Sequence, residues 1–469
     1  MTSMTRYADI RDLTTTDPER AAAQVTAVCD DLDSLGRDLD AVVAIYRDDA
    51  LAQAQTPAQT PAAATPAGAS PLAGVPLAHK ELFRRRNWSD EGGSKSHQGA
   101  LGGETATVIS NLDAAGAIDC GRLVTVEFAF GVTGHNDYSG TPQNPWNRDY
   151  ICGGSSSGSA AVVAAGIVPV ALGTDTGGSV RLPAAACGLF GIKPTHGLVS
   201  RGGVFPLSYA LDTVGPLARR LDDAAVVLDA IISHDPGDPE SISTAMPPLT
   251  GSINDGLDGM RIGRMQRYFL DGCDTPVADR TDAVIGDLGR LGGTVVDIDC
   301  PGIEDGSPLT AILSATESVL VHEQTILQKH QQMNPQTVMR ILAGMFSSDA
   351  DYQQMLHLRG HFSRQMISRL FADIDLLVTP VWPFLLPDRE ASDAGANPDA
   401  AQLVQRIGHN TRPFNWLGLP VVVVPVGLDE NGLPMAVQLV GPPFSEARLI
   451  RAARVLENHY AFWDNRPAV

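Results

Sequence analysis

The chain has 469 residues, 43% of them apolar and 19% charged, which is the composition of an ordinary globular protein with a sizeable core. Its formal net charge of −20 disfavours binding to nucleic acid, because such binding depends on Lys and Arg side chains that neutralise phosphates. The first residues lack the apolar segment of a signal peptide, and no apolar run is long enough to span a bilayer. The sequence therefore predicts a cytoplasmic protein that does not associate with membranes.

The six cysteines show neither the paired spacing of a zinc site nor that of a disulfide framework. We expect reduced, mostly buried thiols and no metal site. The cysteines are Cys29, Cys120, Cys152, Cys187, Cys273 and Cys300.

The beginning of the chain predicts helices followed by a linker. Residues 8–54 place apolar residues at helical spacing, and the pair Asp17 and Pro18 is typical of a helix start. Residues 55–71 are rich in Pro, Ala and Thr, which predicts an exposed, semi-extended linker. The expected division is an N-terminal helical segment packed on the core (1–54), the linker (55–71) and a main domain (72–469).

The main domain alternates predicted helices and strands along its whole length, which favours one large α/β domain over several separate ones. A long surface loop is expected at about 234–258, where Pro, Gly, Asp and Ser are frequent. Helices are expected at 106–118, 308–372 and 445–460. Strands are expected at 72–78, 167–173, 260–265, 292–300, 375–381, 421–428 and 435–441.

Two loops rich in Ser and Gly are the most informative feature of the chain: GGSSSGS (153–159) and GTDTGGS (173–179). Their glycines permit positive φ and let another atom approach the backbone closely. A surface of exposed N–H groups suits a developing negative charge. The pattern therefore indicates acyl transfer through a serine nucleophile, with backbone amides forming the oxyanion hole.

Ser179 ends the second loop and is followed by a predicted short helix, VRLPAAACG. At a helix N-terminus, unpaired N–H groups and the helix dipole favour an anion. The same position also suits a turn serine that only caps the helix, and the local pattern leaves both interpretations open. The amides expected to converge on one oxygen belong to Thr176, Gly177, Gly178 and Ser179.

The first loop also has two interpretations. Ser155 begins a run of serines before an Ala-rich helix, which is ordinarily an N-cap arrangement. The run GSSSG also matches the G-x-S-x-G elbow of α/β-hydrolases, which would make Ser156 the nucleophile. That elbow normally follows a strong apolar strand, whereas RDYIC before this loop is a weak one.

Lys80 ends the predicted strand LAGVPLAHK. A lysine there is usually ion-paired or keeps its ammonium in water. To act as a base it must be neutral, so its pKa has to fall from about 10.4 toward 7–8, at a cost of roughly 4 kcal/mol supplied by burial and nearby donors.

Taken together, these segments resemble the amidase signature family over nearly the whole chain. The two serine loops with GLFGIKPT match its signature region, GVPLAHKELF matches its lysine motif, and FNWLGLPVVVVPVGL with MAVQLVGPP matches its C-terminal core. The resemblance implies a single α/β/α domain with a central twisted mixed β-sheet covered by helices on both faces. It also implies catalysis without metal or organic cofactor.

The resemblance further implies a Ser–cis-Ser–Lys triad. Ser179 would be the nucleophile, Ser155 the bridging serine on a cis peptide after Gly154, and Lys80 the base. Asp175 and Arg181 flank the nucleophile loop, and we expect them to support it without reacting.

The chain departs from the family pattern at two positions near these motifs. Ser157 stands where Gly is usual, and Glu81 stands where Asp is usual. His79, beside the expected base, occurs in some members only, and we assign it no role.

The candidate substrate-binding residues come from the family resemblance and from the positions of aromatic residues. In the family, the residues before GHN line the acyl side of the cleft, here Phe130, Gly131, Val132 and Thr133. Trp382, Phe384 and Trp416 either wall an apolar pocket or are ordinary core aromatics.

Three functions remain open at this stage. The preferred hypothesis is an amidase for a small amide, aryl and carbamoyl compounds included; carbamates, hydrazides and esters react through the same acyl-enzyme. The first alternative is a glutaminase like the A subunit of glutamyl-tRNA amidotransferase, which would need a permanent partner; the second is a non-catalytic binding protein. Family members are often dimers, so a homodimer also stays open.

Overall fold

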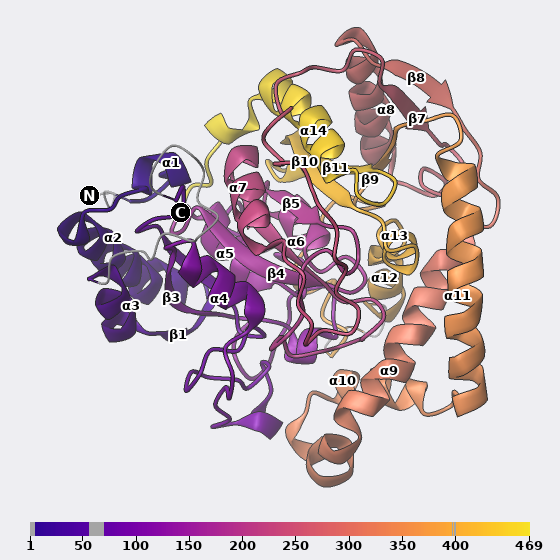
Figure 1. The fold of residues 1–469 in the computed structure, drawn as a ribbon. Coiled ribbons are helices and arrows are strands. Elements are labelled where there is room, and N and C mark those ends of the chain that lie inside the picture. Colours follow the sequence, from indigo (N-terminus) through magenta and orange to yellow (C-terminus); the bar gives the residue numbers. More distant parts are fainter. Residues whose placement is uncertain (1–4, 56–69, 396, 398–399) are drawn as a thin grey trace.

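Two β-sheets organise the described part of the chain, which comprises residues 5–55, 70–395, 397 and 400–469 of a computed structural model (Figure 1). The larger sheet has eight strands and is mixed, because neighbours are antiparallel from β4 to β9 and parallel from β9 to β8. Its strands, in spatial order, are β4 (Val170–Asp175), β6 (Thr213–Ala218), β5 (Phe190–Lys193), β10 (Val421–Leu428), β11 (Pro434–Val440), β9 (Leu376–Pro380), β7 (Arg261–Arg264) and β8 (Thr294–Asp297).

The smaller sheet has three strands in the order β1 (Val42–Ile45), β3 (Ile118–Leu123) and β2 (Pro76–Lys80). Strand β3 is antiparallel to β1 and parallel to β2. Strand β2 also contacts β4 of the larger sheet. The two strands whose ends carry Lys80 and the loop before Ser179 therefore lie next to each other.

Several helices begin at a residue whose side chain caps the helix N-terminus. Asp17 accepts a hydrogen bond from the Glu19 amide at the start of α2, and Asn334 does the same for the Gln336 amide at the start of α10. The helices are α1 (Ile10–Leu13), α2 (Pro18–Asp31), α3 (Arg47–Ala54), α4 (Thr107–Ala114), α5 (Ser157–Ala164), α6 (Arg181–Ala186), α7 (Leu221–Ile231), α8 (Thr275–Arg290), α9 (Gly306–Lys329), α10 (Pro335–Gly344), α11 (Asp349–Leu370), α12 (Ala400–Ile407), α13 (Arg412–Trp416) and α14 (Glu446–Tyr460).

Helices cover both faces of the large sheet, as expected from the family resemblance. Along β10, Val422 and Val424 pack into a core shared with α7 and α14, whereas Val423 packs into a core shared with α5 and α6. Helix α7 contacts α14, and α5 contacts α6. Because side chains alternate along a strand, one strand supplies both layers.

The sequence-based prediction for residues 8–54 is wrong in one part. Val42 to Ile45 form strand β1, paired with β3 from Leu123 to Gly121, and not a helix. A four-residue apolar run suits either structure, and here the unpaired edge of β3 decides between them. The three-stranded sheet is accordingly a feature that the sequence analysis missed.

Other predicted elements are confirmed. The strands expected around 72–78, 167–173, 260–265, 292–300, 375–381, 421–428 and 435–441 are all present, and residues 234–258 contain neither helix nor strand. The helical region 308–372 is divided into α9, α10 and α11, with new helix starts at Asn334 and Ser348. The predicted linker falls almost wholly on 56–69, outside the described residues.

The first helices share a core with the rest of the molecule. Val28 of α2 and Leu32, which follows it, are fully buried in the cluster that contains Ala160 and Val163 of α5. Of the helices in the described ranges, none is both long enough and apolar enough to traverse a bilayer.

Candidate active site

Lys80 lies at the end of β2 with its side chain fully buried. Its Nζ donates to three hydroxyl groups: Ser155 Oγ at 2.7 Å, Thr174 Oγ1 at 2.8 Å and Ser156 Oγ at 3.2 Å. Burial lowers the pKa of Lys80 to about 7, although Asp212 and Asp175 partly oppose the shift. An amine with this pKa is substantially neutral near pH 7 and can accept a proton.

Ser155 follows a cis peptide bond after Gly154. Its carbonyl oxygen accepts hydrogen bonds from the Val126 amide and from Thr125 Oγ1, both at 3.2 Å. A Cβ on Gly154 would lie 2.8 Å from the Gly134 amide nitrogen, so only glycine fits there. The backbone around Ser155 is thus held from both sides, with its hydroxyl directed to Lys80.

Ser179 lies in the loop between β4 and α6 and borders a cavity of 630 Å³. Its carbonyl oxygen accepts from the Ser156 amide at 3.3 Å, which joins the two serine loops. Gly178 before it has a φ of +131°, and an added Cβ there would lie 2.6 Å from Thr411 Oγ1. The glycine is therefore required both by its conformation and by the close approach of the chain that leads into α13.

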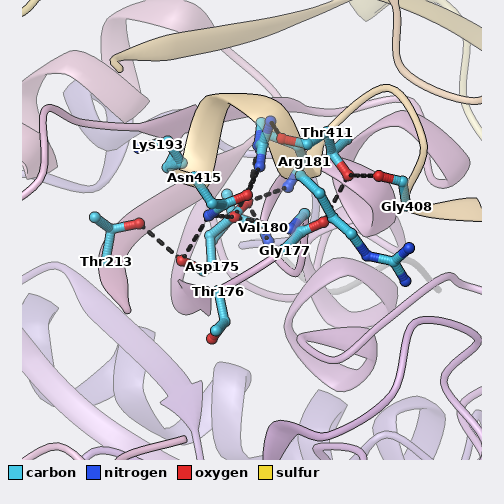
Figure 2. A network of polar contacts seen from close by, with 12 residues as sticks. Asp175, Thr176, Gly177, Val180, Arg181, Lys193, Thr213, Gly408, Thr411 and Asn415 are labelled. Carbon is cyan, nitrogen blue, oxygen red and sulfur yellow. Dashed lines mark hydrogen bonds and ion pairs between the residues drawn. The ribbon is translucent and has the colours of Figure 1, made fainter. Parts of the chain in front are cut away.

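Asp175 holds this loop in shape (Figure 2). Its carboxylate accepts from the amides of Gly178 at 2.9 Å and Val180 at 3.2 Å, from Nε and Nη2 of Arg181 at 3.0 Å, and from Asn415 Nδ2 at 2.8 Å. Burial alone would raise the pKa of Asp175, but the Arg181 guanidinium and these hydrogen bonds outweigh it and hold that pKa well below its usual range.

Arg181 joins the loop that carries Ser179 to the C-terminal part of the chain. Its Nη2 donates to Asn415 Oδ1 at 2.6 Å and its Nη1 donates to the Thr411 carbonyl at 3.0 Å. Thr411 Oγ1 in turn donates to the Gly177 carbonyl at 2.6 Å (Figure 2). The supporting role expected of Asp175 and Arg181 stays a prediction, and these contacts are the observation that supports it.

The predicted oxyanion hole is more restricted than the sequence analysis expected. The Gly178 amide is already engaged by Asp175. Among the described residues, no acceptor forms a hydrogen bond with the amides of Thr176, Gly177 or Ser179. These three amides are therefore the ones available to an incoming oxygen, and all three residues line the cavity.

The predicted acyl-side residues are divided between two neighbouring cavities. Phe130 and Val132 line the cavity at Ser179, and Thr133 lines an adjoining, more polar cavity of 670 Å³, whereas Gly131 borders both. The two cavities share Arg340 in their walls.

The predicted aromatic wall is absent from the described lining of the Ser179 cavity. Trp382 donates from Nε1 to the Leu182 carbonyl at 3.1 Å and borders a different, small cavity together with Phe384. Trp416 is buried in the core and stacks edge-on with Phe362. Both tryptophans are core aromatics, which was the other interpretation of their sequence pattern.

The wall facing Ser179 comes instead from α9, α10, α12 and the start of α13. The sequence predicts that residues about 308–400 shape the pocket, but it does not single out these residues because their helices carry no motif of their own. They are Thr310, Ala311, Ser314, Ala315, Pro335, Gln336, Met339, Arg340, Ala343, Ala401, Val404, Gln405 and Arg412.

Ser156, the nucleophile of the elbow alternative, is fully buried and is not among the described residues lining the cavity. Its hydroxyl donates to the Thr174 carbonyl at 3.4 Å and accepts from Lys80. The geometry therefore favours Ser179 over Ser156 as the residue that meets a substrate.

Of three further buried groups near Lys80, the side chains of His79 and Glu81 have structural partners and the Ser157 hydroxyl has none among the described residues. His79 Nδ1 accepts from the Leu172 amide at 3.2 Å, and burial lowers the pKa of His79 to about 4. Burial raises the pKa of Glu81 to about 7, although its carboxyl accepts from Ser89 Oγ and the Gly93 amide. The Ser157 hydroxyl is buried without a hydrogen-bond partner in the described structure.

Comparison with known proteins identifies the family. The model of the Amidase family matches residues 23–450. The chain is a member of the amidase family. It is therefore an amidohydrolase that acts on carbon–nitrogen bonds.

Three proteins similar to this amidase are described in different terms. The A subunit of glutamyl-tRNA(Gln) amidotransferase from Thermosynechococcus vestitus is 36% identical over 385 residues, covering 77% of this chain and 79% of that protein. A chain from a vestigial protein complex linked to the origins of an s-triazine catabolic enzyme is 30% identical, with a TM-score of 0.84 and coverage of 94% and 95%. The Thermotoga maritima amidotransferase A subunit is 25% identical, with a TM-score of 0.81 and coverage of 97% and 95%.

Proposed function

We propose that this amidase hydrolyses carboxylic amides through an acyl-enzyme on Ser179. The observation that carries the proposal is the buried Lys80, whose Nζ lies 2.7 Å from Ser155 Oγ and whose pKa is lowered to about 7. A base tuned in this way is what activation of a serine hydroxyl near neutral pH requires. Ser179, on the adjacent loop, opens onto a cavity large enough for a small substrate.

In this mechanism neutral Lys80 accepts a proton from Ser155, which takes one from Ser179 as its Oγ attacks the carbonyl carbon. The negative charge on the carbonyl oxygen is met by the amides of Thr176, Gly177 and Ser179. Ser155 then passes a proton to the nitrogen, the C–N bond breaks and the amine leaves. Water attacks the resulting ester through the same relay, which releases the acid and restores the Ser179 hydroxyl.

Two candidate substrates have separate support. The amidotransferase A subunits, at 36% identity, favour a glutaminase that passes ammonia to a partner protein. The cavity favours a small amide that needs no partner, since it is lined mainly by apolar side chains and the described lining contains no carboxylate for the ammonium of glutamine. Sequence relatedness gives the glutaminase the stronger support. The glutaminase would work in a heteromeric complex of the amidotransferase kind. The stand-alone amidase would need no partner protein and could form a homodimer.

A cytoplasmic location is also part of the proposal. The six cysteines are free thiols, which is the usual state in a reducing compartment.

The first test is covalent labelling with a fluorophosphonate, followed by intact-mass measurement and peptide mapping. Labelling at Ser179 that is lost in Ser179→Ala and strongly slowed in Lys80→Ala supports the mechanism. Labelling at Ser156, indifferent to Lys80, overturns it in favour of the elbow arrangement.

The second test measures ammonia release from L-glutamine and from a panel of small aryl and alkyl amides. Faster release from glutamine, together with co-purification of a stoichiometric second protein, supports the glutaminase. Faster release from a simple amide by the chain alone supports the stand-alone amidase.

A further inference from the structure

Asp212, the residue before β6, binds both Thr176 and the loop of residues 207–212 that it ends. Its Oδ1 accepts from Thr176 Oγ1 at 2.5 Å, and its Oδ2 accepts from the amides of Leu207 at 2.8 Å and Ser208 at 3.1 Å. The carboxyl group is buried, and burial raises the pKa of Asp212 although these hydrogen bonds oppose the shift. Asp212 therefore connects the 207–212 loop to a residue of the proposed oxyanion hole.

The peptide group that contains the Thr176 amide is held as well. The carbonyl of Asp175 accepts from Thr213 Oγ1 at 2.9 Å (Figure 2). This carbonyl and the N–H of Thr176 belong to the same peptide group, which is planar and trans, so they point in opposite directions. The hydrogen bond to the carbonyl therefore fixes the direction in which the Thr176 N–H points.

Glu317 on α9 anchors the middle of the 207–212 loop. Its Oε2 accepts from Ser208 Oγ and from the Ala210 amide, the latter at 3.1 Å, and its Oε1 accepts from the hydroxyl of Tyr352 on α11 at 2.8 Å. Glu317 and Ser208 are both fully buried. Because an unpaired polar group is costly to bury, the carboxylate holds its three donors in place. The loop is thus attached to α9 and α11.

Helix α9, which carries Glu317, also lines the Ser179 cavity through Thr310 and Ser314. A continuous series of contacts therefore leads from this wall of the cavity to the Thr176 amide. Backbone amides stabilise an oxyanion only when they lie close to the position that it occupies, and a misplacement of about 1 Å can cost about 100-fold in rate. A residue that holds the 207–212 loop can thus control the rate without touching the substrate.

We infer that Glu317 and Asp212 are positioning residues of the oxyanion hole: through the 207–212 loop they hold the Thr176 amide in the direction of the substrate's carbonyl oxygen. Neither residue is among the described residues that line the Ser179 cavity. The inference rests on the proposed acyl-enzyme at Ser179.

The test measures how a fluorophosphonate labels Ser179, with the rate constant of bond formation, kinact, separated from the constant for reversible binding, KI. In this reaction Ser179 Oγ bonds to phosphorus, fluoride leaves and the serine proton passes to the Lys80 relay. The phosphoryl oxygen gains negative charge in the transition state, so kinact depends on the oxyanion amides whereas KI reports the fit in the cavity. Asp212 is left unchanged because its charge also raises the pKa of Lys80.

Two pairs of variants locate the effect. Thr176→Val removes the hydroxyl that binds Asp212, and Glu317→Leu removes the acceptor for the loop; each should lower kinact at least about ten-fold and change KI by less than about three-fold. Thr176→Ser keeps the hydroxyl, and Glu317→Gln keeps one oxygen for the loop while its amide nitrogen donates to Tyr352, so both should keep kinact within about three-fold of the wild type. The matched control is Glu323→Leu, the same substitution at an exposed position of α9, which should change neither constant.

The double variant tests whether Glu317 acts through Thr176. Thr176→Val with Glu317→Leu should lose no more kinact than the more affected single variant, because both substitutions break the same series of contacts. Losses that multiply overturn the inference, and so does an unchanged kinact in either single variant or a change in KI as large as that in kinact. If Glu317→Leu does not fold, Ser208→Ala takes its place, since it removes one of the hydrogen bonds to Glu317 and should lower kinact at least about three-fold. An unchanged kinact in Ser208→Ala then overturns the inference.

The pH profile separates positioning of the amide from damage to the base. In Glu317→Leu the labelling rate should keep the inflection near pH 7 that belongs to Lys80. Loss of this inflection would place the effect on Lys80 and overturn the inference.

The proposed function and this inference fail in different ways. If the wild type is not labelled at Ser179, the acyl-enzyme itself is wrong. If the wild type is labelled there and Lys80→Ala slows the labelling, but Thr176→Val and Glu317→Leu leave kinact unchanged, the acyl-enzyme stands and only the positioning role is wrong.

Discussion

At the residue scale, the protonation state of Lys80 controls the proposed reaction. Only the neutral amine accepts a proton, and its pKa is about 7, so kcat/KM should rise with pH through about 7 and then level off. Lys80→Arg stays charged over this range, so it should lower kcat/KM by about 10²–10⁴-fold. The measurement is kcat/KM for one amide from pH 5.5 to 9.

A second buried amine provides the control for that profile. Burial also lowers the pKa of Lys193 to about 7, and its Nζ donates to the Pro194 carbonyl at 3.0 Å. If Lys80 is the base, Lys193→Met keeps the inflection near pH 7. If Lys193→Met loses the inflection while Lys80→Arg stays active, the group that titrates near pH 7 is Lys193 and not Lys80.

Arg181 supports the loop that carries Ser179 through its ion pair with Asp175. Both it and Asp175 are fully buried, so Arg181→Met leaves a carboxylate without its counter-ion and should lower the free energy of unfolding by about 3–5 kcal/mol. Arg181→Lys keeps the charge but not the forked contacts with Asp175 and Asn415, so it should lose less stability yet still lose activity. Urea unfolding and steady-state kinetics of both variants check this; full activity in Arg181→Lys would contradict the supporting role.

The sequence predicts those residues of the site that lie in short motifs, and it does not predict those that only the packing of distant helices brings to the site. Lys80, Ser155 and Ser179 lie in short motifs, and the structure brings Lys80 and Ser155 into direct contact while placing Ser179 at the cavity. Arg340 and Arg412 lie in helices without a motif, and only the packing of α10 and α13 brings them to the same cavity. No local sequence signal therefore indicates that these two arginines line the cavity.

At the element scale, the packing of α10 on α9 forms one wall of the cavity. Gly344 at the end of α10 lies so close to α9 that an added Cβ would be 2.0 Å from the Ala315 carbonyl oxygen. Gly344→Ala should therefore push the helices apart and cost about 1–3 kcal/mol of stability. Because Ala315 and Ala343 line the cavity, KM should rise more than kcat falls.

Gly360 on α11 is the matched control. A Cβ there would meet only Arg364 Nη1, at 3.9 Å, so Gly360→Ala should stabilise the helix by about 0.5–1 kcal/mol without changing KM. Thermal unfolding and steady-state kinetics of the two variants make the comparison. Equal effects of the two substitutions would show that helix propensity, and not the contact with α9, determines the outcome at Gly344.

Strand prediction failed where only the pairing with a neighbouring strand distinguishes a strand from a helix. Residues 421–428 and 435–441 form β10 and β11 as expected, since buried central strands read as continuous apolar segments. Strand β1 has four residues and lies within a stretch of helical periodicity, so only its pairing with β3 reveals it. The breaks between α9, α10 and α11 (Figure 1) coincide with the capping residues Asn334 and Ser348, which are local sequence signals for a new helix start.

At the scale of the whole molecule, the charge of −20 is distributed over a structure whose buried carboxylates are mostly paired or hydrogen-bonded. The unpaired negative charges therefore lie mainly on the surface. Their mutual repulsion favours solubility of the protein and does not stabilise its fold. The organisation that matters for stability is the shared core. The cluster containing α5 and α6 also includes residues of α2 and β1, so the same packed side chains support the N-terminal segment and the loop that carries Ser179.

That shared core predicts cooperative unfolding. Leu32 is fully buried, and the turn that contains it contacts α5. Leu32→Ala should therefore lower the free energy of unfolding by about 2–5 kcal/mol. The control is Leu327→Ala, at an exposed position on α9, which should change that free energy by less than about 0.5 kcal/mol. Hydrogen exchange with rising urea should then show α2 and α14 losing protection at the same concentration in the wild type, and at the same lower concentration in Leu32→Ala. If α2 loses protection first while α14 is unaffected by Leu32→Ala, the N-terminal segment is an independent unit, and its burial against α5 does not support the loop that carries Ser179.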